Sequence, residues 1–148
     1  MKVLFDTNVL LDVVEKREPH FSESYQVFMK GARKEIEAII GATSITDIYY
    51  VIKKNCKDAQ QALGLIVDMI KIVTPVDTKA EDIQEAIKMG FPDFEDAVVT
   101  ATATREKVDY ILTRNTGDFI KSPVTAMQPS DFLVLLSDSE HGVANDNR

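Results

Sequence analysis

Several side chains whose oxygen atoms can bind a metal ion occur where short apolar runs of this sequence end or where the next predicted helices begin. The candidates are Asp6, Asp47, Asp96, Asn115 and Asp118. Carboxylates held within a few ångströms of each other repel, which raises a pKa or demands a counter-cation. Because the set contains no histidine or cysteine, its oxygen ligands suit Mg²⁺ or Mn²⁺. Such an ion can activate water and neutralise charge on a phosphodiester, so the residues indicate metal-assisted hydrolysis.

Asp6 lies at a predicted boundary between a strand and a helix. The apolar run 3–5 predicts a buried strand, and a helical pattern begins at Val9. Ligands of open α/β sheets bind at the carboxyl ends of the strands. A carboxylate buried there needs a partner or a cation. The alternative is that Asp6 or Asn8 only caps the helix, and other acids at the same place decide between the two interpretations.

Asp47 and Asp96 each lie near the start of a predicted helix. Asp47 follows the capping residues Thr43 and Ser44, and its alternative role is a favourable contact with the helix dipole. Asp93 is a good N-cap for the segment 93–107. Two acids in one opening turn are more than a cap requires, so Asp96 stays a site candidate.

The elements that must position these residues alternate between short apolar strands and amphipathic helices. The predicted strands cover 3–5, 35–40, 72–76, 110–112 and 124–127. The predicted helices cover 9–15, 21–32, 43–55, 58–70, 78–89, 93–107 and 129–136. This alternation is typical of a mainly parallel sheet with helices on both faces. Strand ends of such a sheet point the same way, which lets the candidate acids converge.

The composition predicts one globular domain over residues 1–136, followed by a disordered tail over 137–148. No apolar run approaches the roughly 20 residues of a membrane span. The apolar start is interrupted at Asp6, which argues against a signal peptide. A single cysteine, Cys56, fits a reducing cytoplasm. His20 and His141 lie near no second histidine or cysteine, which argues against zinc.

The formal net charge is −7, which argues against broad, non-specific binding to nucleic acid. It does not exclude a nuclease whose acids gather around metal ions. A metal-free acidic cleft repels phosphate, whereas bound divalent cations reverse the local field.

Four blocks of the sequence carry a family resemblance. They are VLFDTNVLLD at 3–12, TSITDIYYVI at 43–52, DFEDAVVTATA at 93–103 and LTRNTGDF at 112–119, and together they span about four-fifths of the chain. In this order they resemble the PIN domain, the fold of metal-dependent ribonucleases that include the toxins of bacterial VapBC toxin–antitoxin pairs. The resemblance is greatest to PIN_3-type bacterial members, in which D-F-E-D-A and T-R-N-x-x-D-F both occur.

The resemblance implies roles for the candidate residues. Asp6 matches the first metal-binding acid of the family, and Asp96 matches the third. Asp47 matches the second, which is usually glutamate in the toxins. Asn115 stands at the fourth position, where many members have aspartate, so it offers a carbonyl oxygen without charge. Asp118 is a further candidate ligand that would partly compensate for the missing charge.

Neighbouring polar residues are expected to support these ligands. Thr7, Asn8 and Thr113 would orient the metal-binding side chains by hydrogen bonds. The alternative for Asp118 is that it caps the turn leading into Phe119.

By resemblance the chain is expected to be a three-layer α/β/α sandwich with a central, mainly parallel, twisted sheet. The implied activity is that of a Mg²⁺- or Mn²⁺-dependent endoribonuclease that leaves a 5′-phosphate and a 3′-hydroxyl. Its expected role is the toxin of a type II toxin–antitoxin system, with RNA as substrate, a cognate antitoxin as partner and a homodimer as assembly.

Two other functional classes compete with the nuclease. A PIN-like module with degenerate acids would bind RNA or a protein partner without cutting, and the short Asp47 and uncharged Asn115 favour it. A phosphoryl-accepting aspartate domain fits less well, because Asp6 is followed by Thr7 and Asn8 rather than by the paired aspartates of that chemistry.

Overall fold

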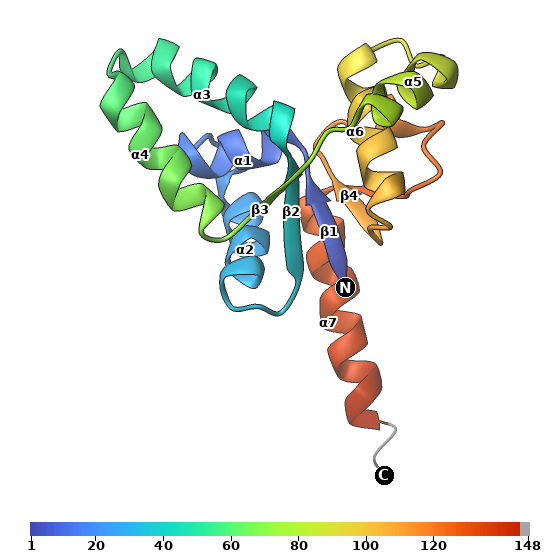
Figure 1. Cartoon of the computed structure of the whole chain (residues 1–148). Helices are drawn as coiled ribbons and strands as arrows, with labels where there is room; N and C mark the ends of the chain where they lie inside the picture. Colours follow the sequence, from blue (N-terminus) through green and yellow to red (C-terminus); the bar gives the residue numbers. More distant parts are fainter. Residues whose placement is uncertain (146–148) are drawn as a thin grey trace.

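Five short parallel strands form the sheet at the centre of the protein (Figure 1). In the computed structural model, which describes residues 1–145, the strand order is β3-β2-β1-β4-β5 and every pairing is parallel. The strands are β1 (Lys2–Phe5), β2 (Glu37–Gly41), β3 (Thr74–Val76), β4 (Tyr110–Leu112) and β5 (Ala126–Met127). Because β1 is the central strand, its carboxyl end lies in the middle of one edge of the sheet.

The helices cover both faces of this sheet. They are α1 (Thr7–Val14), α2 (Phe21–Ala32), α3 (Ala42–Cys56), α4 (Ala59–Ile70), α5 (Ala80–Met89), α6 (Phe94–Arg105) and α7 (Pro129–Asn145), with a short 3-10 helix η1 (Thr116–Phe119). Within residues 1–145, no helix combines the length and apolar composition that a membrane crossing needs.

Alternating side chains of the strands separate the core into two halves, as the two-residue period of a strand requires. Val3 and Phe5 pack into the larger cluster, which also takes buried residues from α1–α4 and α7. Leu4 points to the opposite cluster, which contains Val99 and Ala103 of α6. Figure 1 shows α1–α4 and α5–α6 on opposite sides of the sheet. The predicted three-layer α/β/α sandwich with a central parallel sheet is therefore confirmed.

The C-terminal helix is longer than the sequence predicted. α7 runs from Pro129 to Asn145, so residues 137–145 of the predicted disordered tail are helical, and 146–148 lie outside the described residues. The apolar pattern stops at Leu136, which is why periodicity gave no signal beyond it. α7 packs against α2, and Lys30 Nζ lies 3.9 Å from Glu140 Oε1.

Candidate functional site

Asp6 is a buried carboxylate at the carboxyl end of the central strand. Its backbone N–H donates to the Leu112 carbonyl oxygen of β4 at 2.9 Å, which places it at the junction of two strands. Its side chain accepts from the backbone N–H of Thr7 at 2.8 Å and so caps α1. Only 7% of Asp6 is exposed, far less than a cap on the surface would be. Capping and burial at the strand end therefore coincide in one residue.

A small hydrogen-bond network fixes the orientation of this carboxylate. The hydroxyl of Thr113 donates to Asp6 Oδ2 at 2.8 Å, and the side-chain amide of Asn8 lies 3.3 Å from the same oxygen. Thr113 Oγ1 also accepts from the backbone N–H of Asn115 at 3.1 Å. The backbone N–H of Arg114 donates to Asn8 Oδ1 at 3.3 Å. The loop after β4 is thus joined to the start of α1 around Asp6.

Several carboxylates repel one another at this edge of the sheet. Burial, followed by the charges of Asp93, Asp6 and Asp118, raises the pKa of Asp96 to about 7. Burial also raises the pKa of Asp6, an effect to which Asp118 and Asp93 add and which the hydrogen bonds from Thr113 and Thr7 oppose. These effects show that Asp6 after β1, the acids at the start of α6 and Asp118 of η1 share one electrostatic environment.

Glu95 belongs to the same group, although it was not among the site residues predicted from the sequence. Burial raises the pKa of its carboxyl group, and the charges of Asp47, Asp6 and Asp93 raise it further. Glu95 also lines a small crevice together with Thr43 and Ser44 of α3. The available signal was the run of three acids in D-F-E-D, of which only two were given a role.

Asp47 and Asn115 lie at the margin of the group. Asp47 is exposed on α3 and is brought near Glu95, on which its charge acts. Asn115 precedes η1 and is exposed, and its backbone carbonyl accepts from the N–H of Asp118 at 3.0 Å. Its side chain makes no capping hydrogen bond to that helix. Asp118 is also exposed, and its charge acts on both Asp6 and Asp96.

The donor set fits a divalent cation by its chemistry. The ligands are carboxylate oxygens without nearby histidine or cysteine, and within residues 1–145 no ion pair neutralises any of these acids. The buried hydroxyl of Thr7 has no hydrogen-bond partner in the same described part of the chain. Within that part, no three acids, histidines or cysteines already stand in an ion-binding arrangement.

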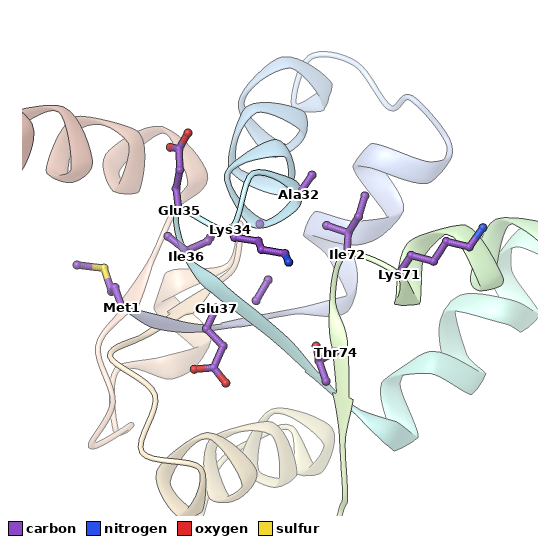
Figure 2. Close-up of a pocket in the computed structure, with 11 residues that line it drawn as sticks. Met1, Ala32, Lys34, Glu35, Ile36, Glu37, Lys71, Ile72 and Thr74 are labelled. Carbon is purple, nitrogen blue, oxygen red and sulfur yellow. The ribbon is translucent and has the colours of Figure 1, made fainter.

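A larger hollow lies at the opposite end of the sheet (Figure 2). It measures about 490 Å³ and is lined by residues next to the amino ends of β1, β2 and β3, among them Met1, Glu37 and Thr74. Lys34 and Lys71 lie there beside Glu35 and Glu37, so its charges are mixed. Since the repelling acids lie at the carboxyl ends of the strands, we place the candidate site there.

Comparison with known proteins identifies the family. The family model described as PIN_3, a PIN domain, matches residues 2–117. The chain belongs to the PIN-domain family. The predicted family is therefore confirmed, and the matched residues include Asp6, Asp47 and Asp96.

Proteins similar to this PIN domain include toxins and toxin–antitoxin complexes. Ribonuclease VapC1 of Aquifex aeolicus is 24% identical over 136 residues, which cover 88% of this chain and 92% of the relative. VapBC2 of Rickettsia felis, bound to a DNA fragment from its promoter, matches with a TM-score of 0.69 at 15% identity, covering 86% of this chain and 98% of that one. VapBC-1 of Haemophilus influenzae matches with a TM-score of 0.67 at 12% identity, covering 88% and 99%. At such identities the structures show a shared fold.

Proposed function

We propose that this PIN domain is a Mg²⁺- or Mn²⁺-dependent endoribonuclease and the toxin of a type II toxin–antitoxin pair. The observation that carries the proposal is the group of mutually repelling carboxylates at the carboxyl end of β1, in which the pKa of Asp96 is raised to about 7. Such a group needs positive charge to become fully ionised. The similarity to a VapC1 ribonuclease supports RNA as the substrate.

Asp6, Asp96 and Asp118 would hold the cation, because the charge of Asp118 raises the pKa of both Asp6 and Asp96, and the charge of Asp6 raises that of Asp96. Asp47 and the side-chain oxygen of Asn115 would be further ligands at the margin. A bound divalent ion supplies a water of lowered pKa and neutralises charge on the phosphate under attack. The exposed or half-buried side chains of the set are free to rotate toward an ion.

The remaining polar residues position these ligands. Thr113, Asn8 and the backbone N–H of Thr7 hold the Asp6 carboxylate by three hydrogen bonds. A carboxylate offers about four acceptor sites, so Asp6 keeps capacity for a cation. Asp93 accepts from the backbone N–H of Asp96 at 3.1 Å and fixes the first turn of α6.

The proposed partner is a cognate antitoxin, and the proposed assembly is a homodimer. The support comes from the structural neighbours, which are VapBC complexes of Rickettsia felis and Haemophilus influenzae. A single free cysteine, Cys56, agrees with a reducing cytoplasm as the place of action.

A non-cutting binding module is the second candidate. It is favoured by the exposure of Asp47 and by the missing charge at Asn115, since both weaken a second metal position. This module would bind RNA or a protein without hydrolysing a phosphodiester.

Cleavage of a mixed RNA pool separates the two candidates. We expect wild type to cut in millimolar Mg²⁺ or Mn²⁺ and to stop in EDTA. Asp6→Asn and Asp96→Asn should each lose at least 10²-fold in rate, the scale of a lost electrostatic contribution to the transition state. Asp68→Asn, an exposed acid on α4, is the matched control and should cut like wild type. RNA that stays intact, or cutting that survives both substitutions, would overturn the nuclease and favour the binding module.

A further inference from the structure

A second hollow opens beside the group of Asp6, Asp93, Asp96 and Asp118, which we call the acid cluster. It has a volume of about 250 Å³, and its acidic wall consists of Asp93, Asp96 and Asp118. Asp96 and Asp118 are also proposed ligands of the cation. Any molecule in this hollow would therefore lie against the group that is proposed to hold the ion and the reacting phosphate.

The lining of the hollow also contains apolar side chains. Phe91 is half-buried and packs against the clusters beneath α6, so it is a fixed surface. Pro92 follows it, and Ile120 completes this apolar part of the lining. Ile120 is 83% exposed, which is unusual for a large aliphatic side chain. An aromatic ring, a proline and an aliphatic side chain together form a stacking surface for a flat, uncharged ring.

Lys121 supplies the one positive side chain of the lining. Its Nζ lies 3.5 Å from the Gly90 carbonyl oxygen, at the rim of the hollow. The lining thus carries three carboxylates and one ammonium group. The net negative charge of the lining repels an anionic ligand unless a divalent cation is present. It does not repel a neutral ring.

We propose that this hollow, the 91–121 pocket, takes one unpaired nucleobase of an RNA strand. The inference rests on the proposed nuclease function for its choice of ligand. The base stacks on the wall of Phe91 and Ile120, and Lys121 contacts a neighbouring phosphate. The next phosphate of the strand then lies at the acid cluster. At about 250 Å³ the pocket is smaller than the 300 Å³ or more typical of drug-sized ligands, which suits a single base.

Single-stranded recognition follows from this arrangement. Bases of single-stranded loops can be splayed out and stacked on aromatic side chains, whereas bases inside a duplex cannot reach such a wall. The pocket would therefore select loops and unpaired segments. It would also set the distance between the recognised base and the bond that is cut.

Gly117 provides a substitution that fills the pocket without disturbing the fold. It lines the pocket on η1, a Cβ added there meets no atom within 4 Å, and its φ is not in the left-handed region. Gly117→Leu should therefore occlude the pocket. Gly64→Leu on α4, where an added Cβ also meets nothing within 4 Å, is the matched control. Ile120→Ser is a second variant, which removes the exposed apolar wall.

The test is a titration of the full-length protein followed by the backbone amide signals in NMR. The probes are adenosine, uridine, adenosine monophosphate and ribose 5-phosphate, each in EDTA and in Mg²⁺. We expect a nucleoside to shift the amides of Gly117, Ile120 and Lys121 even in EDTA. The monophosphate should bind at least tenfold more tightly in Mg²⁺ than in EDTA. Ribose 5-phosphate, which lacks the base, should leave the Ile120 amide unchanged.

Gly117→Leu and Ile120→Ser should each weaken nucleoside binding at least tenfold, while Gly64→Leu binds like wild type. Two results would overturn the inference: ribose 5-phosphate shifts the Ile120 amide as adenosine monophosphate does, or no nucleoside binds. If the protein cleaves RNA but binds no nucleoside, the base-binding pocket is wrong and the proposed nuclease function stands. If the protein binds a nucleoside but cleaves no RNA, the base-binding pocket is supported and the proposed nuclease function is wrong.

Discussion

At the scale of single residues, Asp96 is the carboxylate on which the surrounding acids act most clearly. Its pKa is raised to about 7, first by burial and then by the charges of Asp93, Asp6 and Asp118. In the folded protein it therefore binds a proton more tightly than in the unfolded chain. The tighter binding of this proton stabilises the folded state. That contribution is complete below pH 3.8, the ordinary pKa of an aspartate, and it is lost as the pH rises through about 7.

Replacement of Asp96 by asparagine, which carries no titrating proton, removes the loss of folding stability at high pH. In EDTA at about pH 8 we expect Asp96→Asn to be more stable than wild type by about 1–2 kcal/mol, allowing for solvent screening of a partly exposed group. The difference should shrink toward about pH 4, where wild-type Asp96 is protonated. Urea unfolding across this pH range measures it, with Asp68→Asn as the exposed control. A difference that stays constant with pH would contradict the raised pKa.

Thr113 holds Asp6 by a short side-chain hydrogen bond, at 2.8 Å from Oγ1 to Oδ2. Thr113→Val keeps the shape but leaves Asp6 and the Asn115 N–H without this partner. We expect a loss of about 1–3 kcal/mol in stability, the usual cost of a buried polar group left unpaired. Mn²⁺ affinity should fall by about 10–100-fold because the ligand loses its orientation.

Thr113→Ser keeps the hydroxyl and is the control for that substitution. Thermal melts with and without Mn²⁺ measure both effects. If Thr113→Val bound Mn²⁺ as tightly as Thr113→Ser does, the hydroxyl would have no role in positioning Asp6.

At the scale of elements, one ion pair fastens the loop after β4 to two helices. Arg114 Nε lies 2.7 Å from Asp12 Oδ2, although the N–H is not directed at that oxygen. Asp12, on α1, is fully buried, and Ser24 of α2 donates to the same carboxylate at 3.3 Å. The loop that carries Asn115 and leads to η1 is therefore tied to the helix that Asp6 caps.

Removal of the arginine should destabilise the protein strongly. Arg114→Leu leaves the Asp12 carboxylate buried without its cation, which costs up to about 3–5 kcal/mol. The double variant Asp12→Leu/Arg114→Leu removes both charges and should recover part of that loss. Arg33→Leu, at the exposed end of α2, is the control and should change little. Chemical denaturation decides: equal stabilities for the single and double variants would mean that the pair is not coupled.

Much of the element pattern could be predicted because its signals are local. The apolar period of 21–32 and the run 110–112 predicted α2 and β4 with their bounds. The predicted helix 78–89 ends where α5 ends, and Gly90 follows it with a positive φ of 66°, the conformation that favours glycine. The helical end of α7 over 137–145 was missed, because this segment has no apolar period.

The candidate site was predicted only in part, for a tertiary reason. The ends of parallel strands meet, so the convergence of Asp6 with Asp96 and Asp118 could be expected. The presence of Glu95 near Asp47 and Asp6 could not, because it depends on how α3 and α6 begin beside each other. The sequence offered two interpretations of Asp6, a helix cap or a buried carboxylate at a strand end. The structure shows that the residue is both.

At the scale of the whole molecule, the two ends of the sheet differ in charge. Asp6 and the acids of α6 and η1 meet at the carboxyl ends of the strands, whereas lysines and glutamates share the hollow at the amino ends (Figure 2). The formal net charge of −7 adds to the repulsion of an RNA strand. A divalent cation bound at the acidic end is therefore expected to be needed for RNA binding as well as for its cleavage.

The most direct test of this account is the thermal stability of the protein as Mn²⁺ is added. A ligand that binds only the folded state stabilises it by mass action, by about 2.7 kcal/mol at 100 times its Kd. We predict that Tm rises with Mn²⁺ concentration in wild type and in Asp68→Asn, and that Asp6→Asn and Asp96→Asn lose most of the rise. An equal rise in all four proteins, or no rise in wild type, would contradict a metal centre at the carboxyl end of β1.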